Sequence, residues 1–196
     1  NQDLRPTYAY LLQMLQFLQW QKKKSGREAH RWVLKAPFHL GFGDILFETF
    51  PDARVIQTHR DPRETLPSIT SMAYALWGLN HDDADPKRVG RQSLARWSGA
   101  LRDFTAFRES MPPERFFDCD FRAVGRDPLG EIRRIYAWLE RPLGTEVEDA
   151  MQKWLTRNAR DQRPAHDYSL KKFGFNEAQI DREFAAYRER FDFAAD

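Results

Sequence analysis

The chain has 196 residues, and its 31 Lys and Arg residues against 29 Asp and Glu residues give a formal net charge of +2 at pH 7. Apolar residues at 41% and aromatic residues at 14% are enough for a sizeable core, which argues against a disordered chain. The single cysteine, Cys119, excludes an internal disulfide and a multi-cysteine zinc module. No apolar run reaches the roughly 18 residues of a membrane span and no signal peptide is recognisable, so we expect one cytosolic domain over residues 1–196.

Apolar periodicity predicts a first helix over residues 8–20. The short apolar run at residues 32–34 lies between basic residues and predicts a buried strand. A second strand is expected over residues 53–58, after a short helix that carries Ile45 and Leu46. The spacing of strand, helix and strand is typical of a right-handed crossover, so we expect these two strands to be parallel.

The second predicted strand runs directly into a helix start. Asp61 is a natural N-cap, Pro62 suits the first helical position, and Glu64 completes a capping-box pattern. This helix is expected to continue to about Trp77.

The rest of the chain predicts a third strand over residues 115–121 and several amphipathic helices. Their expected inward residues are Leu94, Trp97, Leu101 and Phe104, then Leu129, Ile132, Ile135 and Leu139, then Val147, Met151, Trp154 and Leu155, and finally Ile180, Phe184, Tyr187 and Phe191. The fold class is therefore α/β, with a short parallel sheet flanked by helices in three layers.

Basic side chains follow two of the predicted strands. Lys35 and His39 come after the first strand and Arg60 after the second, and ligands of open parallel sheets bind beyond such strand ends. The helix that begins at Pro62 adds free backbone N–H groups and a positive dipole end, and Ser68 lies about two turns along it. These residue types predict a pocket for a phosphate ester.

The same residues have plain structural interpretations. Arg60 can pair on the surface with Asp61 or Glu64, and His39 can cap the helix that follows it. His59 alternates to the other side of its strand and is expected to be structural. No spacing of His, Cys, Asp and Glu indicates a metal site.

Three blocks of the sequence closely resemble the bacterial sulfotransferase family, whose members use 3′-phosphoadenosine 5′-phosphosulfate (PAPS). The blocks are Trp32-Val33-Leu34-Lys35-Ala36-Pro37-Phe38-His39-Leu40, Phe50-Pro51-Asp52-Ala53-Arg54-Val55-Ile56 and His59-Arg60-Asp61-Pro62-Arg63. Softer similarities extend over most of residues 31–191. The resemblance implies the P-loop-hydrolase-like architecture of that family.

The resemblance also implies roles for individual residues. Arg60 and Ser68 resemble the pair that holds the 3′-phosphate of the nucleotide. Lys35 resembles the lysine that neutralises the leaving phosphate group. His39 is the best base for the acceptor hydroxyl, because imidazole titrates near neutral pH, although related enzymes also use glutamate.

The sequence departs from the family in three places. The family begins with a strand and a Gly-rich loop for the 5′-phosphosulfate, and nothing in this sequence matches them. The chain also begins with Asn1 and not with an initiating Met. Together these observations predict a truncated domain that lacks its first strand and is weakly active or inactive alone. Phe121 stands where a tyrosine is expected and keeps a ring for stacking. The late basic loop of the family corresponds to residues 160–164 here. Arg160 is the residue expected to reach the nucleotide, Arg163 is its substitute, and the acidic Asp161 lies between them in the sequence.

We therefore expect a sulfotransferase that moves a sulfuryl group from PAPS to a hydroxyl or amine of a small molecule or glycan, without a metal. A degenerate homologue that only binds a nucleotide or a protein partner is the first alternative. A nucleoside or phosphate kinase of similar fold is a weaker one, because the sequence has no Walker-type lysine loop. Nucleic-acid binding is not expected, since acids interrupt the basic residues throughout. The sequence does not reveal the acceptor or the oligomeric state.

Overall fold

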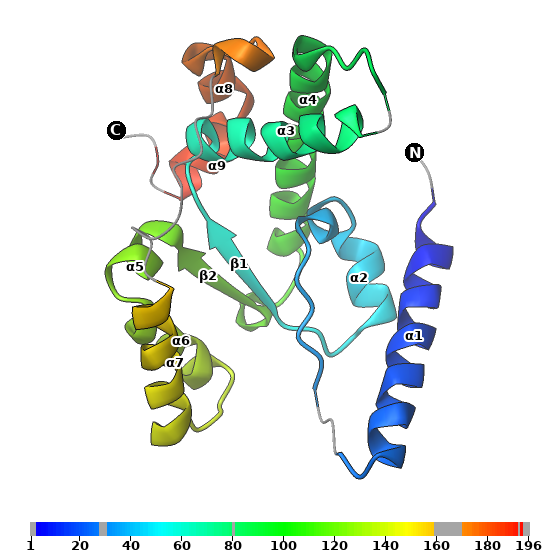
Figure 1. Cartoon of the computed structure of the whole chain (residues 1–196), viewed down its shortest axis with the longest axis vertical. Coiled ribbons are helices and arrows are strands. Elements are labelled where there is room, and N and C mark those ends of the chain that lie inside the picture. Colours follow the sequence, from blue (N-terminus) through cyan, green and yellow to red (C-terminus); the bar gives the residue numbers. More distant parts are fainter. Residues whose placement is uncertain (1–2, 28–30, 80, 159–169, 192, 194–196) are drawn as a thin grey trace.

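The computed structural model describes residues 3–27, 31–79, 81–158, 170–191 and 193. A small parallel sheet lies at its centre, with helices on either side (Figure 1). Strand β1 (Val55–His59) pairs with β2 (Phe116–Asp120) in a register that joins Val55 to Phe116 and His59 to Asp120. The long helices α3 (Pro62–Gly78) and α4 (Pro86–Glu109) connect the two strands. The predicted α/β architecture, rich in helix, is confirmed.

The first core cluster joins the N-terminal helices to the sheet. Helix α1 (Arg5–Lys24) packs against α2 (Gly43–Thr49), which follows the short 3₁₀ helix η1 (Pro37–Gly41). A Cβ at Gly43 would lie 2.8 Å from a Phe107 ring carbon, so only glycine permits this approach of α2 to α4. The buried members of the cluster are Leu4, Tyr8, Ile45, Leu46, Phe47, Phe104 and Phe116.

The second core cluster joins α3 and α4 to the C-terminal segment. That segment comprises η4 (Lys171–Phe173), α8 (Glu177–Glu183) and α9 (Ala185–Arg190). Ile180, Phe184 and Tyr187 are buried as predicted, but the single last helix expected there is interrupted at Phe184. The buried members of the cluster are Leu66, Leu94, Phe173, Phe175, Ile180 and Phe184.

The 3₁₀ turn η2 (Pro113–Arg115) precedes β2. The remaining helices follow β2 and lie on the side of the sheet away from α1 (Figure 1). They are α5 (Phe121–Arg126), α6 (Pro128–Trp138) and α7 (Thr145–Arg157). Helices over the last two ranges were predicted; α5 was not. In the described part of the chain, no helix is both long and apolar enough to cross a bilayer.

The predicted strand at residues 32–34 is wrong. Residues 31–36 have no regular secondary structure, and Val33 is 91% exposed. A strand needs a partner to satisfy its backbone, and among the described residues only β1 and β2 pair with each other. The parallel partner of β1 is therefore β2, and not residues 32–34 as expected.

Candidate functional site

The carboxyl ends of β1 and β2 meet at one edge of the sheet. Because His59 pairs with Asp120, the next residues along the two strands, Arg60 and Phe121, are brought together. The guanidinium carbon of Arg60 lies 4.5 Å from the centroid of the Phe121 ring. A flat cation and an aromatic ring thus lie at the strand edge where ligands of such sheets bind.

The N-terminus of α3 begins directly beyond Arg60. The Asp61 carboxylate accepts a hydrogen bond from the backbone N–H of Arg63 at 2.8 Å, and Pro62 occupies the first turn, as predicted. The helix is 17 residues long, so its aligned peptide dipoles place partial positive charge at this end. The expected free N–H groups are not present there: Pro62 has none, and the N–H groups of Arg63, Glu64 and Thr65 already donate to Asp61, so only the positive end of the dipole lies beside the Arg60 side chain.

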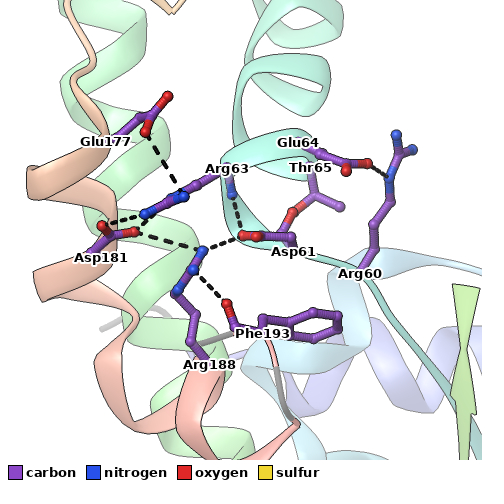
Figure 2. Close-up of polar contacts among 9 residues, drawn as sticks. All are labelled: Arg60, Asp61, Arg63, Glu64, Thr65, Glu177, Asp181, Arg188 and Phe193. Atoms are coloured by element: carbon purple, nitrogen blue, oxygen red, sulfur yellow. Dashed lines mark hydrogen bonds and ion pairs between the residues drawn. The ribbon is translucent and has the colours of Figure 1, made fainter. Parts of the chain in front are cut away.

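Arg60 forms the surface ion pair that was its alternative interpretation. Its Nε donates to Oε2 of Glu64 at 2.6 Å, and the Arg60 and Glu64 side chains are 31% and 58% exposed. Glu64 is therefore engaged by Arg60 and does not complete a capping box. The terminal nitrogens of Arg60 make no hydrogen bond to another described residue (Figure 2).

His59 is structural, as expected. Its Nε2 lies 2.7 Å from Oδ1 of Asp118 and its Nδ1 lies 2.9 Å from the Tyr187 hydroxyl, while its ring stacks on Phe191 at 3.7 Å. Asp118 also accepts two hydrogen bonds from the Arg108 guanidinium, at 2.7 and 2.9 Å. These contacts fasten the end of β1 to α4, β2 and α9.

An ion-pair network fixes the N-terminus of α3 to the C-terminal helices (Figure 2). Arg188 is only 5% exposed, donates to the same Asp61 oxygen that caps α3 at 2.5 Å, and also donates to the Phe193 carbonyl. Asp181 receives two hydrogen bonds from Arg63, at 2.8 and 2.7 Å, and lies 3.6 Å from Arg188. The N-terminus of α3 is thus fixed to the C-terminal helices.

Lys35 and His39 lie on the segment between α1 and α2. Lys35 is exposed within the irregular residues 31–36, and His39 lies in η1 and is partly buried. Burial lowers the pKa of His39, so its ring is neutral at pH 7 and can accept a proton. Nδ1 of His39 lies 2.7 Å from the Tyr8 hydroxyl.

Of the other predicted site residues, the structure describes Ser68 and Phe121. Ser68 is half-buried on α3, two turns beyond Arg60, and Phe121 is 37% exposed at the start of α5. Arg160 and Arg163 lie outside the described residues. In the described part of the chain, no group of three or more His, Cys, Asp or Glu residues could hold a metal ion.

Sequence reasoning missed two residues that support the site. Tyr8 was assigned only to the apolar face of its helix, although a tyrosine among leucines indicates a hydroxyl that needs a partner. Arg188 lay next to a predicted core position, and a charged residue there indicates a buried ion pair. Neither signal names the partner, because His39 and Asp61 are 31 and 127 residues away.

The fold and the strand-edge groups describe an α/β domain with a candidate site for a phosphate ester. The model of the sulfotransferase family matches residues 2–146, and the chain belongs to this family.

Two curated relatives are similar to part of the chain. The omega-hydroxy-beta-dihydromenaquinone-9 sulfotransferase of Mycobacterium bovis is 30% identical over 109 residues, which are 55% of this chain and 28% of that protein. Protein-tyrosine sulfotransferase A of Caenorhabditis elegans is 27% identical over 122 residues, which are 62% of this chain and 30% of that protein. The matched regions span less than a third of either relative.

Two solved structures are similar in fold and sequence. Sulfotransferase STF9 from Mycobacterium avium gives a TM-score of 0.86 at 31% identity, over 98% of this chain and 48% of that one. Sulfotransferase STF1 from Mycobacterium tuberculosis gives 0.64 at 31% identity, over 80% of this chain and 40% of that one. The predicted sulfotransferase architecture is confirmed.

Proposed function

We propose that residues 1–196 belong to a single domain that takes part in transfer of a sulfuryl group from PAPS to a hydroxyl or amine acceptor. The observation that carries this proposal is the position of Arg60. Its guanidinium lies at the end of β1, beside the N-terminus of α3 and over the Phe121 ring. This arrangement suits a nucleotide that carries both a phosphate and an aromatic base.

The 3′-phosphate of the nucleotide is assigned to Arg60 and Ser68. A guanidinium donates two parallel hydrogen bonds to a phosphate, and the dipole of α3 adds positive potential at its N-terminus. Phe121 supplies a ring on which adenine stacks. Arg160, with Arg163 as its substitute, is assigned to the same phosphate from the sequence alone.

Lys35 and His39 are assigned to the transfer step. The acceptor oxygen forms a bond to sulfur as the bond from sulfur to the phosphate oxygen breaks. The Lys35 ammonium neutralises the charge that develops on the leaving phosphate, and His39 takes the acceptor proton. The neutral ring of His39, kept so by burial, supports its assignment as the base.

The names of the curated relatives favour a hydroxyl acceptor. One name specifies an omega-hydroxy compound and the other a protein tyrosine, and both groups offer an oxygen. We therefore place an alcohol or phenol ahead of an amine for this chain, with a small molecule or a glycan as its carrier.

A transfer assay tests the proposal. The full chain is incubated with PAPS and, in turn, 1-octanol, p-nitrophenol and hexylamine, and the sulfated product and released adenosine 3′,5′-bisphosphate are measured by mass spectrometry. Because the sequence shows no loop for the 5′-phosphosulfate, we expect weak but measurable product with the wild type, and no measurable product with Lys35→Ala or His39→Asn. Nucleotide binding without any product would favour the non-catalytic alternative. The absence of both nucleotide binding and product would contradict the proposal.

A further inference from the structure

Tyr8, which lies outside the blocks that resemble the family, contacts His39, which lies in the first of them. The Tyr8 hydroxyl oxygen lies 2.7 Å from Nδ1 of His39, and the two rings meet edge to face with centroids 5.7 Å apart. Tyr8 belongs to α1 and His39 to η1. The contact therefore joins the candidate base to a helix that has no assigned part in the site.

Tyr8 is a rigid partner. It is 2% exposed and packs in the first core cluster with Leu4 and Ile45. An ion pair between Arg5 and Glu48, with 3.0 Å between Nε and Oε2, also ties α1 to α2. The core thus fixes the position of the Tyr8 hydroxyl oxygen. One ring nitrogen of His39, Nδ1, forms a hydrogen bond with it.

The proposed function requires one direction for this hydrogen bond: a neutral ring that takes a proton at Nε2 carries its own hydrogen at Nδ1, so the Tyr8 oxygen accepts. Burial, with a smaller contribution from the negative charge of Asp44, raises the pKa of Tyr8 to about 12, so the hydroxyl stays protonated at neutral pH. The charged groups on the elements around η1 include Lys35 on the same segment, Asp44 of α2 and Arg96 of α4, whose guanidinium carbon lies 5.7 Å from the Phe38 ring centroid.

We propose that Tyr8 is a positioning residue whose hydroxyl accepts a hydrogen bond from Nδ1–H of His39 and leaves the Nε2 lone pair free for a proton. The tautomer of a neutral histidine is set by the bond that its other nitrogen makes. When Nε2 takes the acceptor proton, the resulting imidazolium keeps its Nδ1–H bond to Tyr8. The direction of this bond and its catalytic meaning rest on the proposed function, whereas the contact between Tyr8 and His39 does not.

The tautomer is read directly by NMR on the full chain. Long-range ¹H–¹⁵N spectra separate protonated from unprotonated ring nitrogens, and His39→Asn identifies the signals of His39. In the neutral state we expect Nδ1 protonated in the wild type, a shift of population toward Nε2–H in Tyr8→Phe, and no change in Tyr10→Phe. Tyr10 is a matched control because it lies on the same helix and is 63% exposed. If the spectra show that the neutral ring of His39 in the wild type carries its hydrogen at Nε2 and not at Nδ1, the proposal is wrong, whatever the variants show.

Kinetics test the consequence for transfer. We expect Tyr8→Phe to lower kcat about fivefold to tenfold, the value of one lost hydrogen bond, and to move the acid limb of the kcat pH profile to lower pH. The affinity for adenosine 3′,5′-bisphosphate should stay at the wild-type value. An unchanged kcat and pH profile overturns the positioning role. The expected tautomer in a chain that transfers nothing supports the contact between Tyr8 and His39 and counts against the proposed function.

Discussion

The guanidinium of Arg60 covers the ring of Phe121, with 4.5 Å between the Arg60 Cζ and the ring centroid. The relationship follows from strand register, because each residue is the first beyond a paired strand end. One surface therefore offers a cation for phosphate and a ring for a base. Its parts can be tested separately.

Loss of the Phe121 ring should weaken nucleotide binding without unfolding the chain. We expect Phe121→Leu to lower the affinity for adenosine 3′,5′-bisphosphate about fivefold to tenfold, because a stacking surface and a support for Arg60 are lost together. Phe121→Tyr should retain the affinity. Phe17→Leu, at a 49% exposed ring on α1, is the control for calorimetry. Equal affinities for Phe121→Leu and wild type would remove Phe121 from the site.

Glu64 competes with an anion for Arg60. We expect Glu64→Gln to raise the affinity for adenosine 3′,5′-bisphosphate about twofold to fivefold, because Arg60 is released and a negative charge near the phosphate is removed. Glu48→Gln is a matched control, since Glu48 also pairs with an arginine and its side chain is likewise 58% exposed. A weaker affinity in Glu64→Gln would show that Glu64 holds Arg60 in its binding position.

Arg188 stabilises the N-terminus of α3. We expect Arg188→Met to lower the free energy of unfolding by about 3 kcal/mol, because Asp61 then lacks a nearly buried partner. Arg190→Met, two residues away, breaks a surface pair with Glu109 and should cost at most about 1 kcal/mol. Urea denaturation measures both values. Similar losses in the two variants would contradict a special role for the buried pair.

Asp118 makes part of the stability depend on pH. Burial raises its pKa, but hydrogen bonds from His59 and Arg108 and the charge of Arg108 outweigh burial and hold the pKa well below its usual range. A carboxyl whose pKa is lowered on folding stabilises the fold above its unfolded pKa of about 3.9, and this stabilisation is lost as pH falls toward the folded value. The stability advantage of the wild type over Asp118→Asn should therefore be full at pH 7 and shrink below about pH 4. Urea denaturation at several pH values checks this, and a constant difference would contradict it.

The parts of the site that depend on local signals could be predicted from the sequence. Asp61 and Pro62 mark a helix start by their own side-chain chemistry, and the structure has that start in place. The amphipathic pattern of α4, the long helix behind the sheet, is likewise a property of a single segment. These features need no knowledge of a distant partner.

The parts that depend on distant partners could not be predicted. An apolar run at residues 32–34 becomes a strand only beside another strand, and the described residues provide none there. The Glu64 side chain can accept a hydrogen bond either from the backbone N–H of Asp61 or from the side chain of Arg60. The spacing of these residues in the sequence does not show which of the two bonds forms. The support of Asp61 by Arg188 bridges 127 residues and leaves no periodic trace.

Isothermal titration with adenosine 3′,5′-bisphosphate tests the central claim, that Arg60 binds a nucleotide phosphate at the strand edge. The wild-type chain should bind, and Arg60→Ala should lose at least tenfold in affinity because charge-assisted hydrogen bonds to the phosphate disappear. Arg54→Ala is the matched control: Arg54 directly precedes the same strand, lies over the Trp138 ring and is 33% exposed, against 31% for Arg60. The account predicts wild-type affinity for Arg54→Ala and the loss only for Arg60→Ala; equal affinities for Arg60→Ala and wild type would contradict it.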